Sequence, residues 1–280
     1  TLCEPIEYGM KQWGKRVRPL LTLIAADMFS GDVNKAKSAA IAVEILHNFT
    51  LLHDDIMDQS PLRRGKETVY KKFNSNKAIL SGDTMFALSY KHLLNYDNDI
   101  IKDLVEILTQ SSIEVCEGQA FDMEFETRND VKIEEYINMI RLKTGVLLSC
   151  ALRLGAVTAH CSKENLELLN EFALNIGIAF QIQDDILDCW SDVEVFGKIT
   201  GKDIIDNKKT FLYLKALEIG SQRQQNILQE LYSSKNFEPA QKEQVVKSIY
   251  EDLKIKELAE KEMLHYHNLA IQSLEKIDID

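Results

Sequence analysis

Two clusters of aspartates are the features of this sequence whose residue type and spacing point most directly to chemistry. The pattern D-D-I-x-D occurs twice, as Asp54-Asp55-Ile56-Met57-Asp58 and as Asp184-Asp185-Ile186-Leu187-Asp188. On a helix the first and last aspartates of each pattern share a face and repel each other, and near a helix C-terminus they also oppose the helix dipole. One such cluster could be a solvated acidic helix end, but two copies favour a bound cation. Carboxylate oxygens suit Mg²⁺, which also binds substrate phosphates, so the pair predicts a metal and phosphate site.

Basic residues gather beside both clusters, although the protein as a whole is acidic. The 280-residue chain has 33 Lys and Arg against 44 Asp and Glu, a formal net charge of −11. Arginine binds phosphate oxygens in pairs and lysine supplies a point charge. Each basic residue taken alone could be surface charge, but together they predict a site that closes over an anion. They are Lys15, Arg16 and Arg18 near the start, Arg63 and Arg64 after the first cluster, and Lys198, Lys202 and Lys208 after the second.

The elements that must position these residues are predicted to be long helices. The chain has only 12 Gly and 4 Pro, too few to punctuate many short strands, and no segment alternates as a strand would. We therefore expect an all-α fold in one domain over residues 1–280. The two clusters end helices and precede loops at 58–68 and 191–209, and loops of that length are often functional lids. The expected helices span 33–58, 100–126, 162–188 with Ser162 as N-cap, and 245–277.

Composition excludes several other classes of protein. The acidic balance argues against a nucleic-acid partner, which would require a clustered basic surface. The longest uncharged apolar run, residues 19–26, is too short for a membrane span. Five cysteines without C-x-x-C spacing predict neither a zinc site nor a disulfide framework, so we expect a cytoplasmic protein. Because the chain starts at Thr1 rather than Met, an N-terminal piece is expected to be missing.

The motifs taken together resemble the trans-isoprenyl diphosphate synthases, or polyprenyl synthetases, of the short-chain type that makes geranylgeranyl or farnesyl diphosphate. The resemblance covers roughly residues 5–215, and it implies one large helical bundle around a central cavity, a further helix before Thr1, and a homodimer. Residues 100–125 are a candidate for the dimer interface. The matching motifs are Gly14-Lys15-x-x-Arg18-Pro19, Leu52 to Asp58 with Arg63-Arg64-Gly65, Glu117-Gly118-Gln119 with Asp122, Lys143-Thr144-Gly145, Gln181-x-x-Asp184-Asp185-x-x-Asp188, and Gly197-Lys198 with Lys208.

The resemblance implies a Mg²⁺-dependent condensation of isopentenyl diphosphate with dimethylallyl, geranyl or farnesyl diphosphate. About three Mg²⁺ ions per active site would act as Lewis acids on the departing diphosphate. Two alternatives stay open: a class I terpene cyclase, which normally lacks the second aspartate cluster and a second phosphate site, and a non-catalytic regulatory subunit, which typically loses one cluster. The implied metal ligands are Asp54 and Asp58 on two metals and Asp184 on the third, with Asp55, Asp185 and Asp188 completing the clusters.

Side chains for the two substrates also follow from the resemblance. It makes Lys143, Thr144 and Gln181 the catalytic residues, with the oxygens of Thr144 and Gln181 facing an allylic cation. His47 lies seven residues before Asp54, on nearly the same helical face, where a core histidine would be the ordinary alternative. The allylic diphosphate would contact Arg63, Lys143, Gln181, Lys198 and Lys208, and isopentenyl diphosphate would contact Lys15, Arg18, His47 and Arg64.

Product length is predicted from the two residues that precede the first cluster by one helical turn. Thr50 is in line with Asp54 and small enough for a growing chain to pass, whereas Phe49 is rotated away by the 100° helical step. In the family, an aromatic at the position of Phe49 often forms part of the cavity floor, although Phe49 could also be simply core. We expect a C20 product ahead of C15, with the segment around Met85 and Phe86 as the other candidate floor.

Overall fold

A computed structural model describes residues 2–12, 14–191, 201–233 and 237–279. The structure is helical, apart from one pair of two-residue strands in the described part of the chain, and this confirms the all-α prediction. The chain divides into two compact units, which are described separately below. The single-domain organisation stays a prediction.

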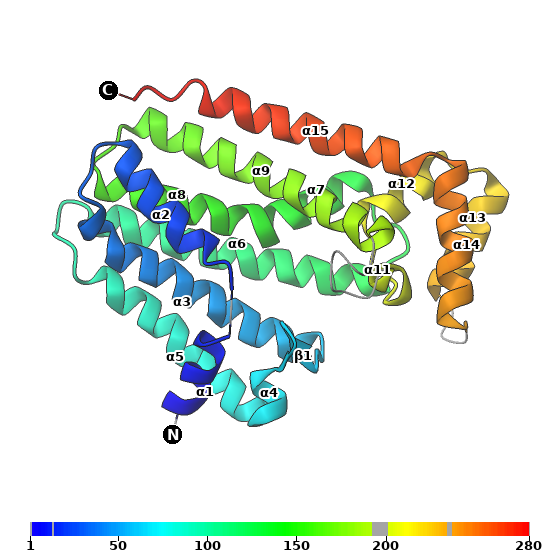
Figure 1. The fold of residues 1–280 in the computed structure, drawn as a ribbon, viewed down its shortest axis with the longest axis horizontal. Helices are drawn as coiled ribbons and strands as arrows, with labels where there is room; N and C mark the ends of the chain where they lie inside the picture. Colours follow the sequence, from blue (N-terminus) through cyan, green and yellow to red (C-terminus); the bar gives the residue numbers. More distant parts are fainter. Residues whose placement is uncertain (1, 13, 192–200, 234–236, 280) are drawn as a thin grey trace. The chain divides into compact units, whose positions relative to one another are not determined.

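The first unit is built on one long helix, α3 (Val33–Met57). It comprises Thr1–Glu114, Val146–Ala173 and Leu274–Asp280. Helix α3 packs against α2, α5 and α8, and Figure 1 shows it beside α5. The other elements of this unit are α1 (Cys3–Met10), α2 (Val17–Met28), β1 (Leu62–Arg63), β2 (Lys66–Glu67), α4 (Val69–Lys72), α5 (Ser75–Leu93), α8 (Val146–Thr158) and the first parts of α6 (Ile101–Thr127) and α9 (Lys163–Trp190).

The sequence of α3 explains why it can be surrounded on several sides. Asp32 caps its N-terminus by accepting a hydrogen bond from the Asn34 backbone N–H at 2.9 Å, as N-cap aspartates do. Ala36, Ala39 and Ala42 are fully buried, and side chains this small let neighbouring helices approach closely. The first aspartate cluster therefore lies at the C-terminal end of a well-anchored helix.

The loop after this helix contains a hairpin that the sequence did not reveal. Strands β1 and β2 pair antiparallel, with Leu62 opposite Glu67 and Arg63 opposite Lys66. The two residues between them, Arg64 and Gly65, both have positive φ angles of 52° and 75°, as in a type I′ turn. The expectation of no strand is wrong here, because a two-residue strand is too short to show alternation.

The second unit comprises Val115–Gly145 and Leu174–Ser273. Its buried core includes Ile182, Phe211 and Tyr250. Helix α9, whose second part lies here, is capped as predicted, since Ser162 Oγ accepts a hydrogen bond from the Asn165 N–H at 3.1 Å. Its further elements are the end of α6, α7 (Ile133–Ile140), the π-helical turn η1 (Arg141–Gly145), the end of α9, α11 (Lys202–Ile205), α12 (Phe211–Ile219), α13 (Gln222–Ser233), α14 (Pro239–Asp252) and α15 (Ile255–Leu274).

The prediction of one continuous helix over residues 245–277 is wrong. The helix breaks between α14 and α15, where Lys254 adopts a left-handed conformation with a φ of 54°. Such a break usually carries glycine, and a lysine there leaves no signal in the sequence. No helix among the described residues is long and apolar enough to cross a membrane.

Candidate active site

The first aspartate cluster ends α3 with its carboxylates held by an arginine. The Asp58 N–H donates to the Asp54 carbonyl at 2.9 Å, so the helical geometry continues and these two residues share a face. Arg63 Nε donates to Asp55 Oδ1 at 2.7 Å, and its Nη2 donates to Asp54 Oδ2 at 3.1 Å. Asp55 is buried, and burial raises its pKa to about 6 although Arg63 opposes this shift. Asp54 and Asp58 are thus the pair on one face, and Asp55 is the anchored member.

Arg64, the residue after Arg63, lies in the hairpin turn, and its side chain contacts a different part of the chain from that of Arg63. The Arg64 side chain lies against Gly14, where a Cβ atom would come within 2.5 Å of Arg64 Nη1. A larger residue at position 14 would therefore displace the Arg64 guanidinium group. Arg64 Nη1 also lies 3.4 Å from the Gln12 carbonyl oxygen. Gly14 and Arg64, far apart in sequence, are therefore in contact.

A buried basic cluster adjoins this point. Arg18 Nη1 lies 3.2 Å from His47 Nε2; because a guanidinium can only donate, Nε2 accepts and the proton of a neutral ring is on Nδ1. Burial, and then the charges of Arg18 and Arg64, hold the pKa of His47 well below its usual value. Burial also lowers the pKa of Arg18 to about 10. Arg18 Nε and His47 Nδ1 are buried donors without a partner among the described residues, and such donors are what an anion would satisfy.

Two other basic residues near this cluster differ in their surroundings. Lys15 is exposed, just before α2. Arg16, which was grouped with the basic residues of the predicted anion site but assigned to neither substrate, donates hydrogen bonds to Glu44 and to the Met10 carbonyl oxygen. Its φ of 50° is left-handed. Arg16 therefore fixes the path of the chain between α1 and α2, while Arg18 is left for a ligand.

The second aspartate cluster lies near the end of α9 and has a buried middle member. Asp185 accepts hydrogen bonds from the Tyr136 hydroxyl at 2.5 Å and from the Phe211 N–H at 3.3 Å. Burial raises the pKa of Asp185 well above its usual value. Gln181 also donates to Asp185, and its Oε1 accepts from Thr144 Oγ1 at 3.2 Å. Two of the predicted catalytic residues, Thr144 and Gln181, are thus joined directly to each other, and Gln181 connects them to Asp185.

An unpredicted aspartate extends this cluster. Asp203 donates its backbone N–H to Asp188 Oδ2 at 3.0 Å. Burial, and then the charges of Asp188 and Asp184, raise the pKa of Asp203 to about 7. Its only signal in the sequence was an acid within a lysine-rich loop.

A second carboxylate, Asp122, which the sequence placed in a matching motif but gave no role in the site, brings two predicted lysines together. Lys143 Nζ donates to Asp122 Oδ2 at 2.7 Å, and Lys208 Nζ lies 3.5 Å from the same oxygen. Burial alone would raise the pKa of Asp122, but the two lysines hold it below its usual value. Lys143 is carried by the π-helical turn η1, which passes so close to Gly118 that a Cβ there would lie 2.6 Å from the Lys143 backbone N. Such turns are frequent at functional sites.

Sequence comparison identifies the family of proteins to which this site belongs. The chain matches the polyprenyl synthetase family over residues 1–253. The chain belongs to this family. It is 42% identical over 242 residues to the short chain isoprenyl diphosphate synthase of Methanocaldococcus jannaschii, a match that covers 86% of this chain and 72% of that protein. It is 41% identical over 239 residues to the geranylgeranyl diphosphate synthase of Sulfolobus acidocaldarius, covering 84% and 72%.

Solved structures agree with this membership of the polyprenyl synthetases. A crystal structure of geranylgeranyl pyrophosphate synthase matches with a TM-score of 0.95 and 43% identity, over 100% of this chain and 86% of that chain. The predicted family and fold class are confirmed. The predicted short-chain prenyltransferase agrees with the names of these relatives, and the terpene cyclase and the regulatory subunit do not.

The carboxylates of this polyprenyl synthetase suit a metal that substrate helps to hold. Among the described residues, no group of three or more His, Cys, Asp or Glu forms a metal site on its own. Mg²⁺ usually takes only one or two protein carboxylates and completes its shell with water and phosphate. Asp54 and Asp58, on one face of the end of α3, provide such a pair, so the residues fit the implied metal.

The predicted floor residue Phe49 belongs to a row of aromatic rings. Its ring centroid lies 4.9 Å from that of His53 and 5.3 Å from that of Phe86, which in turn lies 5.2 Å from Tyr90. Met85 is fully buried. Phe49 and Phe86, the two residues named from the sequence as candidate cavity floors, therefore pack against each other. Lys198, the remaining predicted ligand, lies outside the described residues.

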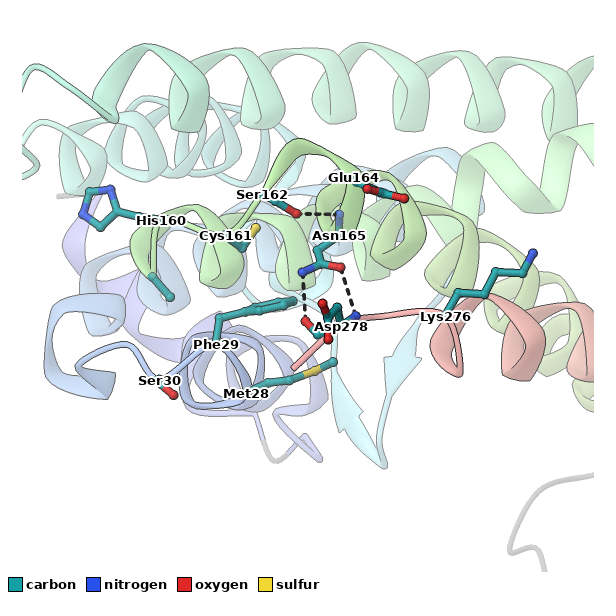
Figure 2. Close-up of a pocket in the computed structure, with 11 residues that line it drawn as sticks. Met28, Phe29, Ser30, His160, Cys161, Ser162, Glu164, Asn165, Lys276 and Asp278 are labelled. Atoms are coloured by element: carbon teal, nitrogen blue, oxygen red, sulfur yellow. Dashed lines mark hydrogen bonds between the residues drawn. The ribbon is translucent and has the colours of Figure 1, made fainter. Parts of the chain in front are cut away.

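Unit 1 also holds a cavity that none of the predicted site residues lines. It has a volume of about 490 Å³, and Phe29, His160, Cys161 and Lys276 are among the residues around it (Figure 2). Asn165 donates to the Asp278 carbonyl and accepts from its N–H. Burial raises the pKa of Cys161 to about 11, so its thiol is protonated at neutral pH. None of the clustered aspartates and none of the basic residues beside them lines this cavity.

Proposed function

We propose that this polyprenyl synthetase condenses isopentenyl diphosphate with dimethylallyl, geranyl or farnesyl diphosphate to a short-chain trans-prenyl diphosphate, with C20 favoured over C15. The observation that carries the proposal is the aspartate cluster repeated at the ends of two helices. Arg63 contacts the first cluster, and the second accepts a hydrogen bond from the Asp203 backbone N–H in the lysine-bearing turn that follows it. Relatives named geranylgeranyl diphosphate synthase support the C20 product.

The carboxylates would hold about three Mg²⁺ ions, which supply Lewis-acid stabilisation of the departing diphosphate. Asp54 and Asp58 would bind two of them and Asp184 the third. Asp55 and Asp185, the middle residues, are buried and hydrogen-bonded, which favours a role in holding the outer aspartates in place. Asp188 would complete the second cluster.

The contacts of the cations support the proposal of two diphosphate sites. The isopentenyl diphosphate would lie on Arg18, His47 and Arg64, where unpartnered N–H donors are buried, with the exposed Lys15 closing the site. The allylic diphosphate would be held by the residues around the second cluster and by the arginine of the first: Lys143, Gln181, Lys198, Lys208 and Arg63.

The reaction would then proceed by ionisation, condensation and elimination. The allylic C–O bond breaks with its electron pair leaving on diphosphate, the double bond of isopentenyl diphosphate forms the new C–C bond, and the released diphosphate removes the proton that restores a double bond. The Thr144 and Gln181 oxygens, which lie 3.2 Å apart, would face the allylic cation, and Lys143 would stabilise the leaving group.

We also propose a homodimer in the cytoplasm. The five cysteines are free thiols, which is typical of a reducing compartment. Ile113, within the predicted interface segment, is half exposed and would be covered by a second copy.

Product analysis tests the function. The protein with Mg²⁺, isopentenyl diphosphate and each allylic diphosphate should release a C20 diphosphate, and no product should form from an allylic substrate alone. Hydrocarbon release from the allylic substrate alone would instead identify a cyclase, and absence of turnover with every pair would identify a regulatory subunit.

A further inference from the structure

Two lysines of the second unit are buried without a carboxylate. Lys209 and Lys242 are only 7% and 4% exposed. Among the described residues no acid lies within ion-pair distance of either, although the charge of Asp206 acts on Lys242 by raising its pKa against the effect of burial. Lysines are almost never buried in this way, because removing an ammonium group from water is costly unless it is paired. Such a cost suggests that these two side chains do something other than stabilise the fold.

Tyrosines and one amide take the place of the missing acids. Tyr213 and Tyr232 stack with ring centroids 3.9 Å apart. Lys209 Nζ lies 5.0 Å and 5.3 Å from these centroids, and Lys242 Nζ lies 4.6 Å from that of Tyr232. Cation–π attraction offsets part of the burial cost. Lys242 Nζ also donates a hydrogen bond to Asn207 Oδ1.

The turn that carries Lys209 also carries Lys208, and the two side chains have different partners. Lys208 Nζ lies 3.1 Å from Glu126 Oε1 and 3.5 Å from Asp122 Oδ2, both on α6, whereas Lys209 contacts tyrosines of α12 and α13. Asn207 turns the chain here with a left-handed φ of 60°. Because Lys208 lies between Asn207 and Lys209 in the chain, the contacts that fix these two residues also set the direction of the Lys208 side chain.

Helix α14 holds this turn at two points. Lys242, on α14, bonds Asn207, and Glu243 packs against Gly201, where a Cβ atom would lie 2.5 Å from Glu243 Cδ. Helices α11 and α14 are in contact along this line. The turn over residues 201–209 is thus fixed from α14 on one side and from the tyrosine pair on the other.

We propose that Lys209 and Lys242 are positioning residues, which lock the 201–209 turn so that Lys208 is presented beside Asp122 for the allylic diphosphate. Neither of them touches substrate; they act through Lys208. The inference rests on the proposed function, which makes Lys208 a diphosphate ligand. Locking a ligand before substrate arrives removes the entropy cost of ordering a long side chain during binding.

The test replaces each buried ammonium by a thioether of similar length. Lys209→Met and Lys242→Met should each raise KM for the allylic diphosphate about tenfold, the loss expected of one charge-assisted contact, with KM for isopentenyl diphosphate unchanged. The thermal midpoint should change little, because the loss of the cation–π contacts and of the hydrogen bond to Asn207 is offset by the removal of a buried ammonium group. Lys256→Met is the matched control, because Lys256 lies on the Trp190 ring of the same unit without contact to the turn, and its kinetics should equal the wild type.

A double-mutant cycle separates this inference from the proposed function. If Lys209 acts through Lys208, then adding Lys209→Met to Lys208→Ala should leave the allylic KM where Lys208→Ala alone puts it. An unchanged allylic KM in Lys208→Ala would overturn the ligand role of Lys208 and with it this inference. A raised KM in Lys208→Ala, with additive or no effects from the methionine variants, would overturn the positioning role alone.

A third variant covers the case in which the methionine variants do not fold. Asn207→Gly removes the acceptor of Lys242 while accepting the left-handed conformation, and it lies outside the core. It should give the same tenfold rise in allylic KM, and a wild-type value would overturn the inference.

Discussion

At the scale of single residues, each aspartate cluster divides into outer and middle members with different surroundings. Asp55 and Asp185 are buried and bound to Arg63 and Tyr136, and burial raises the pKa of both. A carboxyl that is buried and already hydrogen-bonded is a poor metal ligand, because binding would break contacts that cannot be replaced by water. The outer members, Asp54 and Asp184, are therefore the residues to change first.

Asp54→Ala and Asp184→Ala should each lower kcat about a hundredfold or more, because each would remove a group that stabilises the leaving diphosphate in the transition state. EDTA should abolish activity and added Mg²⁺ should restore it. Asp103→Ala, at an exposed position in the first turn of α6, is the control. Near-normal turnover in either cluster variant would contradict the metal assignment.

The adjacent arginines should affect different substrates. Arg64 lies against Gly14 near the buried donors of Arg18, whereas Arg63 bonds Asp54 and Asp55. Arg64→Ala should therefore raise KM for isopentenyl diphosphate about tenfold, and Arg63→Ala should raise that for the allylic substrate by a similar factor. Steady-state kinetics with each substrate varied in turn measures the split. The same pattern in both variants would mean that the two sites are not separated in this way.

At the scale of elements, short irregular segments between the long helices determine where the basic side chains of the site point. The β1–β2 turn sends Arg63 and Arg64 to different partners because two successive residues have positive φ. The π-helical turn η1 does the same for Lys143 and Thr144, whose partners are Asp122 and Gln181. The helices supply the rigid frame, and these pieces determine the direction of each side chain.

Helices α3 and α5 carry the rings that should limit product length. Phe49→Ala removes one ring from the row that includes Phe86 and Tyr90, and the space should admit a longer chain. We expect products beyond C20 with little loss of rate, read by chromatography of the dephosphorylated prenols. Phe73→Ala, which removes a ring packed on Tyr8 instead, should leave product length unchanged. An unaltered distribution in Phe49→Ala would place the floor elsewhere, with Phe86→Ala as the next variant.

The contact of Lys242, on α14, with the 201–209 turn should affect how the free energy of unfolding depends on pH. Burial, together with the charge of Lys209, lowers the pKa of Lys242 to about 8, against about 10.4 in an unfolded chain. Between these values the unfolded protein binds a proton that the folded protein has released, so this group makes the free energy of unfolding rise with pH.

Lys242→Met should lack that rise. Urea unfolding at about pH 7 and about pH 10 should show a difference between wild type and variant that changes by about 2.5 kcal/mol in favour of the wild type at the higher pH. Parallel profiles would mean that Lys242 stays protonated in the fold.

At the scale of the whole molecule, the chain is built of two units with separate cores, and the two aspartate clusters belong to different units. Light scattering at micromolar concentration should give the mass of a homodimer of this 32.0 kDa chain. Ile113→Glu, at the half-exposed position on α6, should shift the mass toward the monomer, because it places a charge where apolar contact is expected. A monomeric mass for the wild type would contradict the dimer.

The sequence by itself determined the helical class, the N-cap at Ser162, the two clusters and the basic residues beside them. These features are local: helical periodicity, capping and residue spacing are properties of a few consecutive residues.

Only the tertiary structure decided which partner each charge meets. Asp122 holds Lys143 and Lys208, Gly14 accommodates Arg64, and Lys209 lies on tyrosines rather than on acids. The break at Lys254 and the turn at Arg64 depend on left-handed backbone at residues other than glycine, which local propensity disfavours. These outcomes depend on long-range packing, and packing can override local preference because the burial of a whole helix outweighs the cost of one unfavourable φ angle.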